Sequence, residues 1–257
     1  MELFEGKQEV QKTSVNKMKI GIVGLGTIGS ELKKTIDKIP KAELIGIYDI
    51  DDDKRTTDLD SLINQADLII ETAHPDIVKQ VLEKCIEKKK DILSLSIGGV
   101  LAFPNIFERI KQAGINLYLP SGAVAGIDAI KAVNGEATSI TLTTTKPAKT
   151  LNQNITEKQL IFQGNAIKAV KEFPTSINVA AILSLASIGP ENVNVKIFAD
   201  PNITNNQHEI CMEGPFGKIT TKVENLPSEN NPKTSYLAIA SAKKTLKQIF
   251  EKVKIGT

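Results

Sequence analysis

Three glycines near the start of the chain have the spacing that binds the phosphates of a dinucleotide. They are Gly24, Gly26 and Gly29, in the sequence GLGTIG, which follows an apolar run and opens a helical pattern. In such a turn the first glycine allows a tight bend, the second lets a pyrophosphate approach the backbone, and the third lets the helix lie close to the strand. Amides at the helix start, here those of Thr27 and Ile28, then face the phosphates with the favourable end of the helix dipole. The alternative is a tightly packed glycine turn that binds no ligand.

A carboxylate completes this pattern further along the chain. Asp49 stands 20 residues after Gly29 and directly follows the apolar run Leu44–Tyr48, which predicts the second strand. A carboxylate in this position accepts hydrogen bonds from the adenosine ribose and repels the 2′-phosphate of NADP. Lys54 and Arg55 follow closely and could turn toward such a phosphate. The sequence therefore predicts NAD as the preferred cofactor, with measurable use of NADP.

The two histidines of the chain, His74 and His208, are its candidates for proton transfer. An imidazole with a pKa near 6.5 exchanges protons at neutral pH. His208 lies in the polar segment Ala199–Ile210, which we predict to be a loop between two strands, and functional side chains are frequent in such loops. The residues alone leave open whether His208 transfers protons or caps the loop. His74 precedes Pro75 at a predicted strand-to-helix turn, and we expect it near the edge of the cofactor.

Three further segments follow predicted strands and are rich in small or hydroxyl-bearing residues. They are Glu71–Pro75, Ser94–Gly99 and Pro120–Gly126. In the first segment, Thr72 and Ala73 are small enough to let the nicotinamide half of a dinucleotide pass. In the third, the backbone amides of Ser121, Gly122 and Ala123 precede a predicted helix and could bind a carboxylate or carboxamide. Close packing alone is the alternative explanation for each of these segments.

A substrate carboxylate bound by the second half of the chain cannot meet an arginine from that half. Arg55 and Arg109 are the only arginines among the 32 basic residues, so the other 30 are lysines, and both arginines precede residue 120. The partners of such a carboxylate must then be lysine, hydroxyl, amide or backbone N–H groups. Lys146, beside Pro147, is our candidate, and an ordinary surface lysine on a threonine-rich strand is the alternative.

The first part of the chain alternates strand and helix signals. Predicted strands are Lys19–Val23, Leu44–Tyr48, Leu68–Glu71, Ile92–Leu95 and Ile115–Leu119, and predicted helices are Ile28–Ile39, Pro75–Lys89 and Pro104–Ala113. Both prolines suit the first turn of a helix. The polar connection between Asp51 and Asp67 is not expected to hold a full helix. Short apolar strands separated by helices predict an α/β fold with a Rossmann-type, doubly wound parallel sheet.

The pattern changes after Pro120 and predicts a second, α+β domain. Predicted helices are Ser121–Val133, Ala166–Lys171 and Thr175–Ala186, and predicted strands are Thr138–Thr145, Val193–Phe198, His208–Met212 and Lys218–Val223. We expect a mixed sheet with helices on one face, and a last helix within Lys233–Lys252 that packs back onto the first domain. The predicted domains are thus an N-terminal extension (1–17), a dinucleotide-binding domain (18–120) completed by the C-terminal helix (232–257), and an α+β domain (121–231).

Composition excludes several classes of function. The chain has 257 residues, of which 41% are hydrophobic and 24% charged, as is ordinary for globular proteins. A net charge of +2 gives no reason to expect nucleic-acid binding, and no apolar run reaches the ~18 residues that span a membrane. Cys85 and Cys211 have neither metal nor redox spacing, so we expect free thiols, no metal and a cytoplasmic, reducing location.

Several motifs in order make the chain similar to one family, the L-aspartate dehydrogenases. The resemblance runs from Met18 to about Ala242 and rests on GLGTIG, ETAHP, SGAVAGIDAI, TKPA, FPTSINVAAILSLA, ADPNITNNQHEI and NPKTS. It implies that His208 is catalytic and that Ala123 and Asn178 contact the dinucleotide. It also implies that the α+β domain (121–231) serves catalysis and oligomerisation. The N-terminal 17 residues depart from the family pattern, which usually begins at the first strand.

The family resemblance also implies a reaction. It is the NAD(P)-dependent oxidation of L-aspartate to iminoaspartate, which hydrolyses to oxaloacetate and ammonia or feeds NAD biosynthesis through quinolinate. The expected partners are this small-molecule substrate and further copies of the chain, as a homodimer or larger oligomer, with no nucleic acid and no membrane. The rivals are a homoserine-dehydrogenase-like or dihydrodipicolinate-reductase-like oxidoreductase, whose motifs we do not find, and a redox sensor that binds NAD(H) without chemistry.

Overall fold

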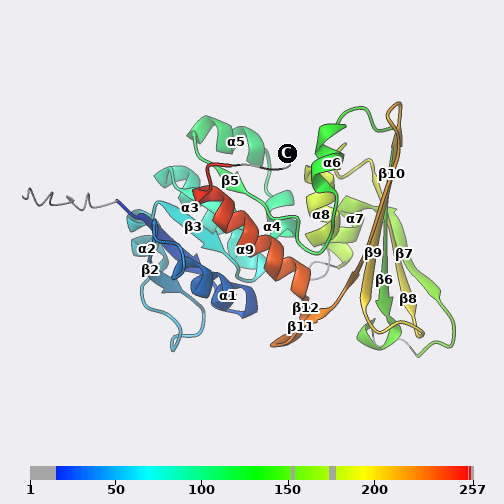
Figure 1. Ribbon diagram of the computed structural model, residues 1–257, viewed down its shortest axis with the longest axis horizontal. Helices are drawn as coiled ribbons and strands as arrows, with labels where there is room; N and C mark the ends of the chain where they lie inside the picture. Colours follow the sequence, from blue (N-terminus) through cyan, green and yellow to red (C-terminus); the bar gives the residue numbers. More distant parts are fainter. Residues whose placement is uncertain (1–15, 152–153, 174–177, 254, 256–257) are drawn as a thin grey trace, which may run out of the picture.

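A computed structural model describes residues 16–151, 154–173, 178–253 and 255. Two five-stranded sheets organise the chain, and helices lie between and around them (Figure 1). The fold class predicted from the sequence is confirmed, since a parallel sheet with helices on both faces is joined to a mixed sheet with helices on one face. Apart from Asn16 and Lys17, the predicted N-terminal extension lies outside the described residues. Within the described ranges, no helix is long and apolar enough to cross a bilayer.

The first sheet is parallel throughout and has the strand order β2-β1-β3-β4-β5. Its strands are β1 (Met18–Val23), β2 (Ala42–Tyr48), β3 (Leu68–Glu71), β4 (Asp91–Ser94) and β5 (Leu117–Tyr118). The chain runs outward from β1 to β2 and then returns past β1 to β3. The connections that leave the carboxyl ends of β1 and β3 therefore run in opposite directions. Ligands of open α/β sheets bind in the crevice at such a point.

Helices cover both faces of the parallel sheet because successive strand residues point to opposite sides. On one face lie α1 (Thr27–Ile36) and α9 (Tyr236–Phe250), and on the other lie α2 (Leu59–Gln65), α3 (Pro75–Lys88) and α5 (Ile106–Ala113). Because crossovers are right-handed, α1 is the one helix connecting two strands of this sheet that lies on its face. Ala242 and Leu246 of α9 belong to the same buried cluster as the residues of α1 and of the sheet on that face, so the last helix returns to the first sheet as predicted (Figure 1).

The second sheet is mixed and has the strand order β10-β9-β6-β8-β7. Its strands are β6 (Ser139–Pro147), β7 (Gln159–Asn165), β8 (Val193–Asp200), β9 (Asn206–Gly214) and β10 (Gly217–Asn225). Strands β6 and β8 are parallel, and the other neighbours are antiparallel. On the side toward the parallel sheet lie α6 (Ile127–Ala132), α7 (Ala166–Glu172) and α8 (Asn178–Leu185) (Figure 1). The remaining elements are α4 (Ile97–Leu101), the 3₁₀ helix η1 (Ala148–Leu151), and the hairpin β11 (Pro227–Ser228) and β12 (Asn231–Ser235).

The sequence prediction differs from the structure at several helix starts. The predicted helix Ser121–Val133 begins only at Ile127, because Gly122 and Gly126 have φ angles of 69° and 80°, in the left-handed region. Helix α5 begins at Ile106, so Pro104 precedes the helix and its cap instead of occupying the first turn. The connection after β2 does hold a helix, α2, although it has only 7 residues. Residues 175–177 of the predicted helix before Ala186 lie outside the described residues.

Two differences from the sequence prediction bear on the site. His208 stood both in the predicted loop Ala199–Ile210 and at the start of the predicted strand His208–Met212, and the structure confirms the strand, because β9 begins at Asn206 and pairs with β6 and β10 along its length. Lys233 does not belong to the last helix but to β12, and α9 begins after Ser235, whose hydroxyl accepts a hydrogen bond from the Ala238 amide. Strand β7 was not predicted, and β5 is only 2 residues long.

Candidate functional site

Two adjoining cavities lie where the parallel sheet meets the mixed sheet. The glycine-turn cavity has a volume of about 670 Å³ and is lined by Gly24, Gly26, Tyr48, Asp49, Ile50, Thr72, Ala73, His74, Asp76, Ile77, Ser96 and Asn178. The His208 cavity has a volume of about 290 Å³, and its lining includes Ile28, Ser121, Gly122, Ala123, Lys146, Asn178, Asn225, His208 and Lys233. Asn178 lines both, so the imidazole of His208 and the glycine turn open onto neighbouring spaces.

The glycine turn has the geometry of a phosphate cradle. Gly24 has a φ angle of 92°, and a Cβ atom at Gly24 or Gly29 would collide with backbone of the turn or of the loop after β3. The Thr72 hydroxyl donates to the Gly24 carbonyl at 2.5 Å and holds these segments together. At Gly26, by contrast, an added Cβ would have no atom within 4 Å. The open backbone at Gly26, directly before α1, fits a pyrophosphate against the first amides of the helix.

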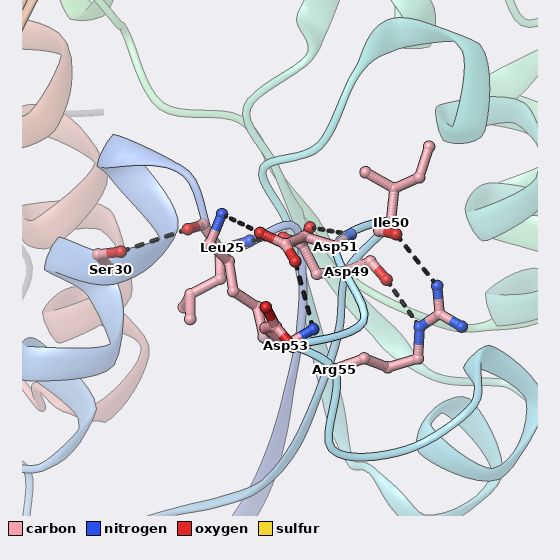
Figure 2. A network of polar contacts seen from close by, with 8 residues as sticks. Leu25, Ser30, Asp49, Ile50, Asp51, Asp53 and Arg55 are labelled. Atoms are coloured by element: carbon pink, nitrogen blue, oxygen red, sulfur yellow. Dashed lines mark hydrogen bonds and ion pairs between the residues drawn. The ribbon is translucent and has the colours of Figure 1, made fainter.

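Asp49 fixes the end of β2 to the glycine turn. Its Oδ2 atom accepts a hydrogen bond from the Leu25 amide at 2.5 Å, and its Oδ1 atom accepts one from the Asp51 amide at 2.9 Å (Figure 2). The side chain of Asp49 is buried, and the residue lines the glycine-turn cavity where a ribose would lie. The residues present therefore fit the adenosine half of a dinucleotide.

The two basic residues after Asp49 are turned to partners in their own loop. The Arg55 Nε atom donates to the Asp49 carbonyl at 2.7 Å (Figure 2). Its guanidinium also lies 2.9 Å from a carboxylate oxygen of Asp52. The same guanidinium stacks 5.1 Å from the ring centre of Tyr48. Lys54 pairs with Asp51 at 2.8 Å. Neither basic residue belongs to the lining of the cavity, so a 2′-phosphate would need one of these ion pairs to open.

A buried carboxylate that the sequence analysis did not single out shapes the floor of the crevice. Glu71, at the end of β3, is 1% exposed and accepts hydrogen bonds from the Ala73 and Ser96 amides and from the hydroxyls of Ser94 and Ser96, at 2.6 to 3.2 Å. Burial raises the pKa of Glu71, and these donors act against that rise. The carboxylate thereby joins the two loops that follow β3 and β4.

Asn178 forms the wall between the two cavities. Its Oδ1 atom accepts a hydrogen bond from the Gly98 amide at 3.1 Å, and its Nδ2 atom donates to the Leu95 carbonyl at 3.2 Å. Both partners belong to the backbone after β4. The side-chain amide is thus held in one orientation at the first residue of α8, where it borders both cavities.

His208 projects from β9 on the side of the mixed sheet that faces α8. Ile210 and Met212 follow on the same side of β9 and are completely buried in the core, whereas His208 lies at the end of that core and lines the cavity. Its Nδ1 atom lies 3.0 Å from the Thr144 hydroxyl, its cross-strand neighbour on β6. Burial, and to a smaller extent the charge of Lys146, lowers the pKa of His208 from 6.5 to about 4.

The His208 cavity carries positive and neutral groups. Among the described residues that line it, the charged side chains are Lys146 and Lys233, and there is no aspartate or glutamate. Lys146 is two residues beyond Thr144 on the same side of β6, and burial lowers its pKa. A small dianion therefore matches this cavity better than a cation does.

The small-residue segment after β5 lies at the same cavity, although its amides are not all free. Ser121, Gly122 and Ala123 line the cavity. The Gly122 amide, which we expected to bind a carboxylate, donates instead to the Ser241 hydroxyl of α9 at 3.0 Å. The segment is also not helical before Ile127, so no helix dipole acts at these amides. Lysine side chains are consequently the stronger anion partners here.

The structure divides the predicted site residues between the two cavities. Gly24, Gly26, Asp49 and Ala73 line the glycine-turn cavity, whereas Ile28, Ser121, Gly122, Ala123, Lys146 and His208 line the other, and Asn178 lines both. Thr27 and Gly29 lie in the first turn of α1 and line neither, and the Thr27 hydroxyl accepts a hydrogen bond from Asn231 at 3.2 Å. His74 is exposed at the rim of the glycine-turn cavity and lies 3.1 Å from an Asp76 carboxylate oxygen.

Sequence reasoning missed Thr144, Asn225 and Lys233. The Asn231-Pro232 pair is a turn signal that argued against starting a helix at Lys233. No comparable signal exists for Thr144 and Asn225, whose positions depend on which strands pair. Within the described ranges, no group of three or more histidine, cysteine or acidic residues is placed to hold a metal ion.

Two family models match the chain and together span most of it. Residues 24–120 match the NAD-binding domain described for homoserine dehydrogenase, and residues 128–249 match the C-terminal domain described for aspartate dehydrogenase. The first match includes the glycine turn and Asp49, and the second includes His208, Lys146 and Lys233.

Individual proteins give the same result over nearly the whole length. An L-aspartate dehydrogenase of Methanosarcina barkeri is 39% identical, over 93% of this chain and 100% of the relative. One of Methanococcus maripaludis is 38% identical with the same coverage. Among solved structures, an aspartate dehydrogenase of Thermotoga maritima superposes with a TM-score of 0.74 at 25% identity and covers 94% of this chain and 100% of its own.

Proposed function

The chain belongs to the L-aspartate dehydrogenase family and is an NAD(P)-dependent oxidoreductase of L-aspartate, and from this premise we propose that His208 is its proton-transfer residue. One observation carries the proposal. The imidazole lines a cavity that holds two lysines and no acid among its described residues, and this cavity adjoins the glycine-turn cavity through Asn178. An amino acid with two carboxylates bound there would have its α-carbon beside the cofactor.

The reaction requires two proton transfers around one hydride transfer. The α-ammonium of L-aspartate must lose a proton before the α-carbon can give up a hydride, for which a bound nicotinamide cofactor would supply the acceptor. The resulting imine is then hydrolysed to oxaloacetate and ammonia. His208 accepts the proton from the α-ammonium and later one from the attacking water, and it returns each proton to solvent. Its low pKa keeps the ring neutral at pH 7, so a lone pair is available at the start.

The choice of ring nitrogen follows from the contact with Thr144. Because Nδ1 lies 3.0 Å from the Thr144 hydroxyl, we assign proton exchange to Nε2, with Nδ1–H donating to that oxygen. L-aspartate carries two carboxylates and one ammonium, so its net negative charge favours the imidazolium form, and its binding therefore raises the pKa of His208 from the low value of the free protein. The base would become stronger when the substrate is in place.

We assign the two substrate carboxylates to Lys146 and Lys233. Both lysines line the His208 cavity from different elements, β6 and β12. Two separated cations match the two carboxylates of aspartate, and each pair is a charge-assisted contact. Glutamate is one methylene longer, so the same spacing disfavours it. Asn178 and the two loops that Glu71 joins, after β3 and β4, would hold the nicotinamide ring against the α-carbon. Hydride transfer needs the reacting atoms about 3 to 3.5 Å apart.

We further propose NAD as the preferred cofactor, with measurable use of NADP. Asp49 supports the preference because its carboxylate lines the cavity where the 2′-phosphate of NADP would lie. Arg55 and Lys54 support the residual use, since either could exchange its acidic loop partner for that phosphate.

Two wider proposals accompany this assignment. Residues 18–120 with the C-terminal helix would form the dinucleotide-binding domain, and residues 121–231 the domain for catalysis and self-association. The chain would form a homodimer or larger oligomer, and light scattering would test this oligomeric state. The iminoaspartate would feed NAD biosynthesis when it is captured before hydrolysis.

The decisive test of function is an assay of nicotinamide reduction with L-aspartate beside D-aspartate, L-glutamate and L-homoserine. We expect turnover with L-aspartate and at least about tenfold lower kcat/KM with the others, since each mismatched or missing contact is worth roughly 1.4 kcal/mol or more. Equal turnover of L-homoserine would contradict the assignment of two carboxylates to two lysines.

A further inference from the structure

One side-chain atom at the His208 cavity is buried without a partner. Asn225, the last residue of β10, is 4% exposed and lines this cavity. Its Nδ2 atom donates to the Ala123 carbonyl at 3.0 Å, whereas its Oδ1 atom has no hydrogen bond. Among the described residues, Oδ1 of Asn225 is the only buried side-chain nitrogen or oxygen atom in this condition. A buried acceptor without a donor is costly, because its interaction with water is lost and nothing replaces it.

The orientation of this amide is fixed by its surroundings. Exchange of the Asn225 nitrogen and oxygen would bring two oxygen atoms together at the Ala123 carbonyl, so Nδ2 must remain there. Oδ1 is therefore the atom that needs a donor. The donor must come from something that enters the site or moves within it.

Strand pairing puts Asn225 close to the proposed base. Asn225 faces Asn206 across β9 and β10, and Val223 faces His208. His208 and Asn225 are thus diagonal neighbours on the same side of the sheet, and residues so related lie roughly 7 to 8 Å apart, with their Cβ atoms somewhat closer. A single amino group can lie between an imidazole and an amide at that separation.

The charges of the cavity indicate which donor completes the site. Lys146 and Lys233 can pair with carboxylates, but no acidic side chain among the described lining residues can receive an ammonium group. We propose that Oδ1 of Asn225 accepts a hydrogen bond from the α-amino group of L-aspartate and so orients it toward His208. This inference rests on the proposed function and names the residue that recognises the amine.

A neutral acceptor suits this reaction better than a carboxylate would. The α-ammonium must lose a proton before the hydride leaves, and a carboxylate beside it would hold that proton by stabilising the charged form. An amide oxygen accepts a hydrogen bond from the ammonium, from the neutral amine and from the imine N–H in turn. Asn225 can therefore orient the nitrogen through the reaction without opposing its deprotonation.

The test compares two dicarboxylates that differ by the amino group. In the Asn225→Leu variant of the full-length protein, we expect the KM for L-aspartate to rise about tenfold, which corresponds to roughly 1.4 kcal/mol. Succinate, which lacks the amine, should inhibit the variant with a Ki within about twofold of the wild-type value. Asn205→Ala is the matched control, because the Asn205 amide bonds to Glu224 instead, and it should change neither constant.

The alternatives predict different patterns. If Oδ1 instead positions Lys146 or Lys233, or if Asn225 only supports the Ala123 loop, both constants rise together and the inference is wrong. If neither constant changes, Oδ1 has no ligand and the inference is again wrong. Should Asn225→Leu fail to fold, as judged by its thermal unfolding, Asn225→Ser gives the same comparison. A wild type that does not oxidise L-aspartate overturns the proposed function together with this inference, whereas equal changes in an active enzyme overturn the inference alone.

Discussion

His208 Nδ1 and the Thr144 hydroxyl lie 3.0 Å apart, on facing positions of two antiparallel strands. The contact holds the imidazole ring through a residue of a rigid sheet and not through a loop. A ring held in this way keeps one nitrogen for the sheet and the other for the cavity. Precision of this kind is what a proton-transfer group needs, because such a group must reach its proton within hydrogen-bond distance.

Replacing His208 should abolish most turnover and leave cofactor binding intact. We expect His208→Ala to lower kcat about 10²- to 10⁴-fold, the range that general acid–base catalysis contributes. NADH affinity, measured by fluorescence titration, should stay within about twofold of wild type, because His208 lines the other cavity. His74→Ala is the matched control, since its exposed side chain lies at the cofactor rim. Undiminished kcat in His208→Ala would end the assignment.

Neutralising either lysine of the His208 cavity should weaken aspartate binding. Lys146→Met and Lys233→Met each remove one charge-assisted contact, worth about 1.5 to 3 kcal/mol, so we expect the KM for L-aspartate to rise roughly 10- to 100-fold. Steady-state kinetics at saturating NAD measures this. Lys149→Met is the control, because Lys149 lines only neighbouring cavities. A lysine whose replacement leaves KM unchanged is not a carboxylate partner.

Much of the parallel sheet could be predicted from the sequence because buried parallel strands are continuous apolar runs. Ile20, Ile22 and Val23 in β1 are completely buried, and the glycine turn follows without interruption. Strand β7 was missed because it lies at the edge of the mixed sheet, where Leu160 is 49% exposed and the apolar run, residues 160–162, is only three residues long between polar neighbours. An edge strand needs no continuous apolar pattern, and the pairing of β7 with β8 depends on contacts distant in the sequence.

The site was predictable where one short segment determines its geometry. Gly24, Gly26 and Asp49 belong to a local strand–turn–helix pattern, which determines their placement. Lys233 and Asn225 come to His208 only through strand register and the β11–β12 hairpin, and a sequence does not specify these locally. His208 itself was placed where a predicted loop and the predicted strand His208–Met212 overlap, because its neighbours Gln207 and Glu209 are polar, although they are the outward-facing residues of β9.

Removing the carboxylate after β2 should relax the choice of cofactor. We expect Asp49→Ser to raise the ratio of kcat/KM for NADP to that for NAD by at least about tenfold, since it removes both a ribose partner and a repulsive charge. Wild type should prefer NAD. Asp76→Ser is a suitable control, because Asp76 lines the same cavity near His74 and away from β2. A wild type that requires NADP would contradict the interpretation of Asp49.

Acid should destabilise the protein through His208. The pKa of this residue is about 4 in the folded protein and 6.5 when unperturbed. Between these values the unfolded chain binds a proton that the folded protein does not, so the free energy of unfolding decreases as the pH falls from 6.5 to 4. At 1.36 kcal/mol per pKa unit, the loss is on the order of 3 kcal/mol. Above pH 6.5 this contribution is constant.

The His208→Asn variant isolates this effect. Denaturant unfolding of wild type and variant at several pH values should show a shallower loss of stability in the variant between pH 6.5 and 4. His74→Asn, which replaces an exposed histidine, should retain the wild-type slope. Parallel slopes for wild type and His208→Asn would mean that the imidazole is not held neutral in the folded protein.

Two glycines of one turn should respond oppositely to the same substitution. In Gly26→Ala the new methyl group meets no atom within 4 Å, and the φ angle of −76° is accessible to alanine, so we expect stability within about 0.5 kcal/mol of wild type. The methyl group would instead occupy the space for the pyrophosphate, and NADH should bind roughly 10- to 100-fold more weakly.

In Gly29→Ala the new methyl group would collide with the Gly24 carbonyl and lie 2.8 Å from the Thr72 hydroxyl. This collision should lower the free energy of unfolding by about 1 to 3 kcal/mol. Thermal unfolding and NADH titration of both variants separate the two effects. Wild-type NADH affinity in a folded Gly26→Ala protein would show that the phosphates do not lie against this turn.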